Sequence, residues 1–156
     1  MNTKIAIRDM KLADLDAVME IESESFLAPW LRRDFLYELQ ENPLNVMYVL
    51  ETEHDGVKEI IGFIDFMVTF TSASISQIAI KKAYRGNNYG SELMQAMLNY
   101  LKERYSQEVE TITLEVRTHN ETAINFYKKH GFEPVVVKSH YYDNGDDALY
   151  MIRRLI

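Results

Sequence analysis

Apolar and polar residues follow two kinds of periodicity along this chain. Strict alternation or short apolar runs predict seven strands, at residues 4–8, 46–50, 60–70, 74–80, 111–117, 132–137 and 148–153. Apolar residues at helical spacing predict four helices, at residues 12–26, 32–39, 88–104 and 120–130. The clearest alternation is at residues 111–117, where Glu115 shares the polar side of the strand with Arg117.

The order of these elements predicts the fold class. A strand, two helices, three strands, a helix, a strand, a helix and two strands indicate an α/β (α+β) protein with a mixed, mostly antiparallel central sheet flanked by helices. The helix at residues 88–104 is long enough to connect neighbouring parallel strands. Turns are expected at residues 54–56 and 71–73, and Gly131 is expected to end the last helix. The chain has no internal repeat or linker, so we expect one domain over residues 1–156.

Composition narrows the function classes. A net charge of −7 argues against nucleic acid as a partner, because a phosphate backbone requires a basic face. The chain contains no cysteine, which excludes disulfides and a cysteine nucleophile. The four histidines lack metal-ligand spacing, so no metal site is expected. No apolar stretch is long enough to span a membrane, and the N-terminus does not resemble a signal peptide. We therefore expect a cytoplasmic protein without membrane contact.

The segment between the strand at 74–80 and the helix at 88–104 is the best candidate for a binding site. It is basic and contains Gly86 and Gly90, which allow the main chain to come close to a ligand. A helix N-terminus offers unpaired N–H groups, and Arg85 adds positive charge, so the segment suits a phosphate. A plain strand-to-helix turn explains the same residues equally well. Neither a Walker loop nor a dinucleotide-binding fingerprint is present.

This segment resembles a known cofactor loop. Residues 85–90 resemble the Q/R-x-x-G-x-G/A pyrophosphate loop of GNAT acetyltransferases, which bind acetyl-CoA. These residues are Arg85, Gly86, Asn87, Asn88, Tyr89 and Gly90. Asn88 stands where the family has glycine, and asparagine tolerates a left-handed backbone better than most residues. The resemblance implies that Ser91 also lies in the coenzyme site. It further implies that the backbone of Ile78, Ala79 and Ile80 pairs with the pantetheine arm.

A second resemblance covers nearly the whole chain and is narrower. Within the GNAT superfamily, the sequence is similar to the ribosomal-protein-alanine N-acetyltransferase (RimI) family. The matching positions are residues 114–117 (LEVR), Asn120, residues 125–127, Gly131-Phe132, Pro29-Trp30 and Tyr141-Tyr142. This resemblance implies the GNAT fold and transfer of an acetyl group from acetyl-CoA to an amine.

The same resemblance implies roles for individual residues. Glu115 would be the general base, acting through water, although a lone glutamate on a strand is otherwise a solvated residue. Tyr127 would be the general acid and would contact the coenzyme, and a packing role for its ring is compatible with this. Asn120 either contacts coenzyme A or caps its helix. Tyr141 and Tyr142 either form a wall of the acceptor cleft or are partly packed aromatic residues.

The sequence leaves several possibilities for the acceptor amine. An α-amino group has a pKa of ~7.7–8.0 and a lysine side chain ~10.4, so a single carboxylate removes a proton more easily from a protein N-terminus. The resemblance implies the N-terminal alanine of a ribosomal protein. A small amine such as a polyamine or an antibiotic is the alternative acceptor. A non-catalytic acyl-CoA-binding module is the alternative class.

Overall fold

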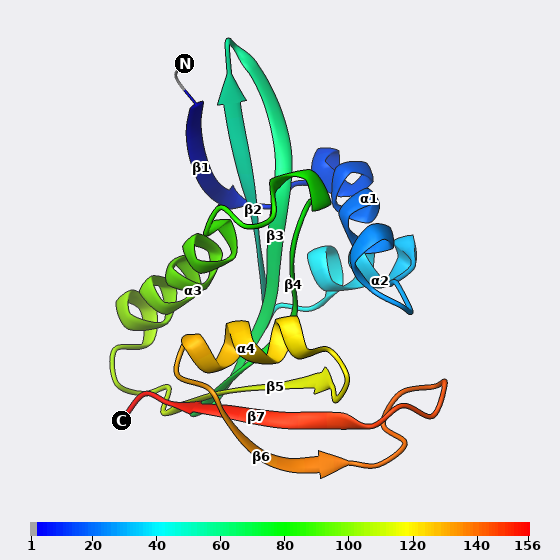
Figure 1. Cartoon of the computed structure of the whole chain (residues 1–156). Helices are drawn as coiled ribbons and strands as arrows, with labels where there is room; N and C mark the ends of the chain where they lie inside the picture. Colours follow the sequence, from blue (N-terminus) through cyan, green and yellow to red (C-terminus); the bar gives the residue numbers. More distant parts are fainter. Residues whose placement is uncertain (1–2) are drawn as a thin grey trace.

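The computed structural model describes residues 3–156 and shows one sheet with helices on both faces (Figure 1). The strands are β1 (Thr3–Asp9), β2 (Asn45–His54), β3 (Val57–Thr69), β4 (Ser72–Ile80), β5 (Thr111–Arg117), β6 (Glu133–Lys138) and β7 (Ala148–Arg154). The α-helices are α1 (Leu15–Ser25), α2 (Arg32–Leu36), α3 (Tyr89–Tyr105) and α4 (Glu121–Lys129). Short helical turns are η1 (Leu12–Asp14), η2 (Tyr37–Glu41) and η3 (Lys82–Tyr84).

The sheet is mixed and mostly antiparallel, as the sequence predicts. Its strand order is β1-β2-β3-β4-β5-β7-β6, and only β4 and β5 are parallel neighbours. The crossover between these two strands is α3, because two parallel strands need a long connection. None of the helices among residues 3–156 is long and apolar enough to cross a membrane.

Two apolar layers hold the helices against the sheet. One layer packs α3 and α4 on the first face and includes Leu93, Met97 and Tyr127. The other packs α1 and α2 on the opposite face and includes Val18 and Phe35. The strand β3 is buried on both faces, which explains why its sequence is a nearly continuous apolar run.

Several predicted elements differ from the structure at their ends, and two of these differences change the local structure. The helix expected at residues 32–39 is α-helical only to Leu36 and continues as the π-helical turn η2. The hairpin expected at 71–73 turns one residue earlier, at Phe70 and Thr71, with Phe70 at φ +49°. Ala73 is instead a fully buried residue of β4, so its small size serves packing.

The pairing of β4 with β5 is short and determines the shape of the molecule. Only residues 72–74 of β4 pair with residues 111–113 of β5. Beyond this point β4 continues beside β3, while β5 continues beside β7, and the two strands diverge (Figure 1). Ser76 has no partner on β3 and forms a β-bulge, which bends β4 where the divergence begins. The facing edges of both strands therefore have no strand partner beyond this point.

A buried carboxyl group lies in β3 under the α1 and α2 layer. Asp65 is fully buried, and neither of its carboxyl oxygens has a hydrogen-bond partner among the described residues. Burial raises the pKa of Asp65 to about 8, and Glu38 and Glu22 nearby add to the shift. Because the pKa in the folded state lies above the unfolded value, the folded protein keeps a proton that the unfolded chain releases.

We expect Asp65→Asn to increase stability more at pH 8 than at pH 4. Between these values the free energy of unfolding of the wild type falls as the pH rises, and an amide does not titrate. Thermal melting at pH 4, 6 and 8 measures this difference. The exposed Asp143→Asn variant is the control and should change the melting temperature by a constant amount. If Asp65→Asn changed the melting temperature by the same amount at every pH, the raised pKa of Asp65 would be contradicted.

Candidate active site

The loop between β4 and α3 has a left-handed backbone at two of its residues. Gly86 has φ +83°, a conformation that favours glycine. Asn88 is left-handed, at φ +63° and ψ +15°, and α3 begins at the next residue. The N–H groups of Tyr89, Gly90 and Ser91 belong to the first turn of α3, where no helical carbonyl can accept them. Three donors and the positive end of the helix dipole therefore lie together.

Close packing against α4 explains the second glycine of the loop. A Cβ atom added at Gly90 would lie 3.1 Å from Phe126 Cε1, so a larger residue would push α3 and α4 apart. The next residue also links these helices, because the Ser91 hydroxyl and His130 Nε2 are 2.9 Å apart. The Ser91 hydroxyl is therefore engaged with α4, whereas its N–H lies in the first turn of α3.

The side chains of the loop bind the protein itself. Arg85 Nε donates to the carbonyl of Ile80 at 2.9 Å, and Arg85 Nη2 donates to Ser25 Oγ at 3.0 Å. Asn87 Nδ2 donates to the carbonyl of Tyr84 at 3.0 Å. In addition, Lys82 N donates to Glu24 Oε1 at 2.7 Å. These contacts place the loop against the last turn of α1, and its main chain supplies the free donors.

Residues 78–80 lie on the diverging part of β4. Ile78 and Ile80 pack into the layer under α3 and α4, and Ala79 packs into the opposite layer. Their pairing with β3 leaves the edge toward β5 without a strand partner. Unpaired backbone groups at a strand edge can pair with an extended ligand.

Glu115 lies on the other side of this divergence, in β5. Its side chain is 24% exposed, and its Oε1 accepts a hydrogen bond from the Tyr141 hydroxyl at 3.2 Å. Lys138 Nζ lies 3.8 Å from its other oxygen. The carboxylate thus reaches solvent on a rigid strand and faces a hydroxyl and an ammonium group. Burial and the neighbouring carboxylate raise the pKa of Tyr141, so its hydroxyl stays a donor.

Tyr127 is a buried residue of α4. Its ring packs against the rings of Phe126 and Phe132, with centroids 5.5 and 5.7 Å apart. Burial raises the pKa of Tyr127 well above that of an ordinary tyrosine, and the nearby Tyr142 raises it further. The hydroxyl therefore keeps its proton at neutral pH.

The connection from β6 to β7 brings both tyrosines of the predicted cleft to this place. Arg117 pairs with Asp146 at 2.6 Å, and its guanidinium lies 3.9 Å from the centre of the Tyr142 ring. The rings of Tyr141 and Tyr142 are 5.0 Å apart and perpendicular. Asp146 is held inside this loop and is not a free charge for attracting a basic peptide.

Asn120 caps α4, because its Oδ1 accepts a hydrogen bond from Ala123 N at 3.2 Å. Capping explains this side chain. Trp30 packs against Phe35 with ring centroids 5.2 Å apart, as expected for a packing residue.

Three polar residues near the site did not stand out in the sequence: Glu22, Gln77 and Lys138. Glu22 is fully buried, and its Oε2 accepts hydrogen bonds from Trp30 N and Gln77 Nε2. Its position was a usable signal, because it falls four residues after Val18 and seven after Leu15, on the apolar face of α1.

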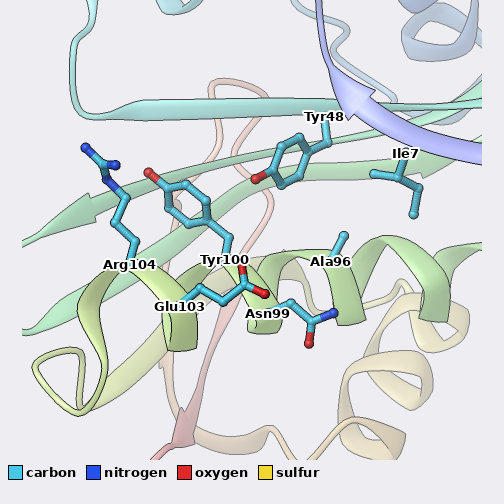
Figure 2. A pocket seen from close by; sticks show the side chains of 7 residues that line it. All are labelled: Ile7, Tyr48, Ala96, Asn99, Tyr100, Glu103 and Arg104. Atoms are coloured by element: carbon cyan, nitrogen blue, oxygen red, sulfur yellow. The ribbon is translucent and has the colours of Figure 1, made fainter.

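A cavity of about 670 Å³ lies elsewhere, between α3 and the first two strands (Figure 2). Its lining residues are Ile7, Tyr48, Ala96, Asn99, Tyr100, Glu103 and Arg104. None of them belongs to the predicted site, which is instead an open strand divergence. Within residues 3–156, no three His, Asp or Glu side chains are arranged to hold a metal ion.

Comparison with known proteins agrees with this geometry. Residues 15–132 match the acetyltransferase (GNAT) family. A Bacillus subtilis protein, provisionally named as a ribosomal protein bS18-alanine N-acetyltransferase, is 40% identical over 97% of this chain and 96% of its own length. The crystal structure of the ribosomal-protein-S18-alanine N-acetyltransferase from Escherichia coli superposes with a TM-score of 0.82. It is 25% identical and covers 97% of this chain and 94% of its own.

A third similarity concerns the fold alone. Arabidopsis thaliana NAA60, solved in complex with acetyl-CoA, has a TM-score of 0.85 at 18% identity, over 97% of this chain and 99% of its own.

The unpaired edges of β4 and β5, together with the N–H groups at the start of α3, suit a ligand that has an extended arm and a phosphate. The chain belongs to the acetyltransferase (GNAT) family. It is an N-acetyltransferase.

We expect Asn88→Gly to leave the dissociation constant of acetyl-CoA within about twofold, since asparagine already adopts the left-handed backbone at this position. Asn88→Val should raise it at least about tenfold, because a β-branched residue is strongly strained there. Isothermal titration calorimetry measures both variants. A tenfold tighter complex of Asn88→Gly would instead mean that the asparagine side chain obstructs the coenzyme.

Proposed function

We propose that this enzyme acetylates the N-terminal α-amine of a protein, with the N-terminal alanine of a ribosomal protein as the acceptor. The proposal rests on one observation: four side chains lie near one another beside the diverging strands. They are Glu115, Tyr141, Tyr142 and Tyr127. The names of the Bacillus subtilis and Escherichia coli relatives support the same acceptor.

We assign the coenzyme to the divergence and to the loop that follows β4. The N–H groups at the start of α3 suit its diphosphate, with Gly86, Asn88 and Gly90 allowing the close approach. The free edge of residues 78–80 suits the amide groups of its pantetheine arm. When bound, the coenzyme supplies the activated acetyl group as a thioester.

Glu115 is the proposed general base. An attacking amine needs a free lone pair, and its ammonium form must first lose a proton. The Glu115 carboxylate is partly exposed and reaches solvent, so it can take this proton through one water molecule. Tyr141 and Lys138 orient the carboxylate from two sides, which limits the rotation of its side chain.

Tyr127 is the proposed general acid. The departing thiolate needs a proton, and a tyrosine hydroxyl that stays protonated can donate one. The raised pKa of Tyr127, caused by burial, keeps its hydroxyl protonated. Base and acid thus come from β5 and α4, which are adjacent elements.

The pKa of the acceptor favours an N-terminus. An α-amine has a pKa about 2.5 units below that of lysine, which makes its deprotonation easier by about 3.4 kcal/mol. The exposed ring of Tyr141 offers a surface for the first residues of a peptide.

We expect Glu115→Gln to lower kcat by about a hundredfold while the protein still binds acetyl-CoA, because only the proton acceptor is lost. The substrate is a peptide that begins with a free alanine followed by basic residues, and intact-mass detection measures the product. Glu110→Gln, an exposed residue just before β5, is the control and should retain full activity.

Two further acceptors decide the substrate class: an N-terminally blocked, lysine-containing twin of the peptide, and spermidine. Transfer to the free alanine peptide alone supports the proposal. Transfer to spermidine alone would place the enzyme among small-amine acetyltransferases. Coenzyme binding without turnover on any amine would indicate a binding module.

We expect Tyr127→Phe to lower kcat by about ten- to a hundredfold, because it removes the proton donor and keeps the packed ring. In the wild type, kcat should not fall between pH 8 and 10, since the pKa of Tyr127 lies above the ordinary tyrosine value. Steady-state rates across this range test both statements. Tyr105→Phe, a ring packed on Tyr100 away from the site, is the control. A wild-type rate that falls at the ordinary pKa of tyrosine would contradict the assignment.

A further inference from the structure

The connection from α1 to α2, residues 26–31, packs on the protein through the side chains of Phe26 and Trp30. We call these residues the acceptor-side loop. Leu27, Ala28 and Pro29 are exposed, whereas Phe26 and Trp30 are half-buried. A polar contact also links the loop to the sheet.

One buried carboxylate supplies that contact. Glu22 Oε2 accepts a hydrogen bond from Trp30 N at 2.8 Å and another from Gln77 Nε2 at 2.7 Å. Glu22 belongs to α1, Trp30 to the acceptor-side loop and Gln77 to β4. A single oxygen atom thus joins α1 and the loop that follows it to β4, which is 55 residues further along the chain.

Gln77 lies next to the part of β4 to which we assign the coenzyme. Gln77 directly follows the bulge at Ser76 and directly precedes residues 78–80, to which we assign the coenzyme arm. The Glu22 carboxylate therefore joins residues 26–31 to the strand to which we assign the coenzyme arm.

Packing alone does not explain a carboxylate at this position. Glu22 is fully buried, and its Oε1 has no hydrogen-bond partner among the described residues. Burial also raises the pKa of Glu22, which reflects the cost of keeping a charge there. An apolar residue of similar size would avoid this cost, since buried polar groups often stabilise less than the apolar residues that can replace them. What an apolar residue cannot do is accept two directed N–H bonds.

We propose that Glu22 is a positioning residue that sets the distance between the acceptor-side loop and β4, so that the amine meets the thioester. The inference rests on the proposed function, because it takes residues 26–31 as part of the acceptor's surroundings. Glu22 itself touches neither substrate. Its loss should affect the acceptor and leave coenzyme binding intact, since the coenzyme loop is held separately through Glu24 and Ser25.

The first test is kinetic and uses the full chain with the free alanine peptide. Glu22→Leu should lower kcat/KM for the peptide by about ten- to a hundredfold, because a small misplacement of a reacting group has effects of this size. The dissociation constant of acetyl-CoA should stay within about twofold. Glu22→Gln keeps one carbonyl oxygen that can accept both bonds, so it should stay within about threefold of the wild type.

The second test does not depend on activity. Trp30 is the one tryptophan of the chain, so intrinsic fluorescence reports on the acceptor-side loop alone. Glu22→Leu should shift the emission to longer wavelength and increase quenching by acrylamide. The reason is that the backbone N–H of Trp30 loses its hydrogen bond to Glu22, so the loop is less firmly held. Glu20→Leu, an exposed residue of the same helix, is the matched control and should leave emission and kinetics unchanged.

Each outcome has a defined meaning. The inference is overturned if Glu22→Leu folds and keeps both its kinetics and its Trp30 emission, or if peptide and coenzyme binding fall equally. If Glu22→Leu does not fold, Gln77→Met removes the same bond from the β4 side and should give the same selective loss. If the wild type is inactive on the peptide, only the proposed acceptor is refuted. The variants are then compared by their rates with spermidine as the acceptor and by their Trp30 emission.

Discussion

The early end of the pairing between β4 and β5 is the constraint on which the rest of the structure depends. Three residue pairs hold these strands together at their beginning, and the bulge at Ser76 then bends β4 away. An open sheet edge normally exposes backbone groups to unwanted pairing. Here two such edges face each other inside one molecule, so a ligand can lie between them and pair with the chain. The loop after β4 and the start of α3 extend this site toward a diphosphate.

In the proposed mechanism, the acid–base residues lie on the β5 side of the divergence and the coenzyme lies on the β4 side. On the β5 side, Glu115 is oriented by groups from the connection to β7, and Tyr127 is buried in α4. On the β4 side, the last turn of α1 contacts the coenzyme loop through Glu24 and Ser25, and Glu22 contacts Gln77. Because α1 lies on the opposite face of the sheet from α4, both layers of the protein contribute to one reaction site (Figure 1).

Local patterns in the sequence predicted the elements and the conformation of several residues of the proposed site. Strict alternation at residues 111–117 placed Glu115 on the polar face, and the loop motif marked Gly86 and Gly90. The left-handed Asn88 also agrees with the tolerance expected of asparagine. The divergence of β4 and β5 was not predictable, because a bulge depends on how two strands register in three dimensions. The meeting of Tyr141 with Glu115 joins residues 26 positions apart and is likewise a result of the tertiary fold.

Binding of a conjugate in which coenzyme A is joined to the N-terminus of an alanine peptide tests the central claim most directly. If both substrates meet at the divergence of β4 and β5, the conjugate should bind at least about a hundredfold more tightly than coenzyme A alone. It should also bind more tightly than a conjugate with spermidine. A peptide conjugate that binds no better than free coenzyme A would contradict the account, because the peptide would then have no site beside the thioester.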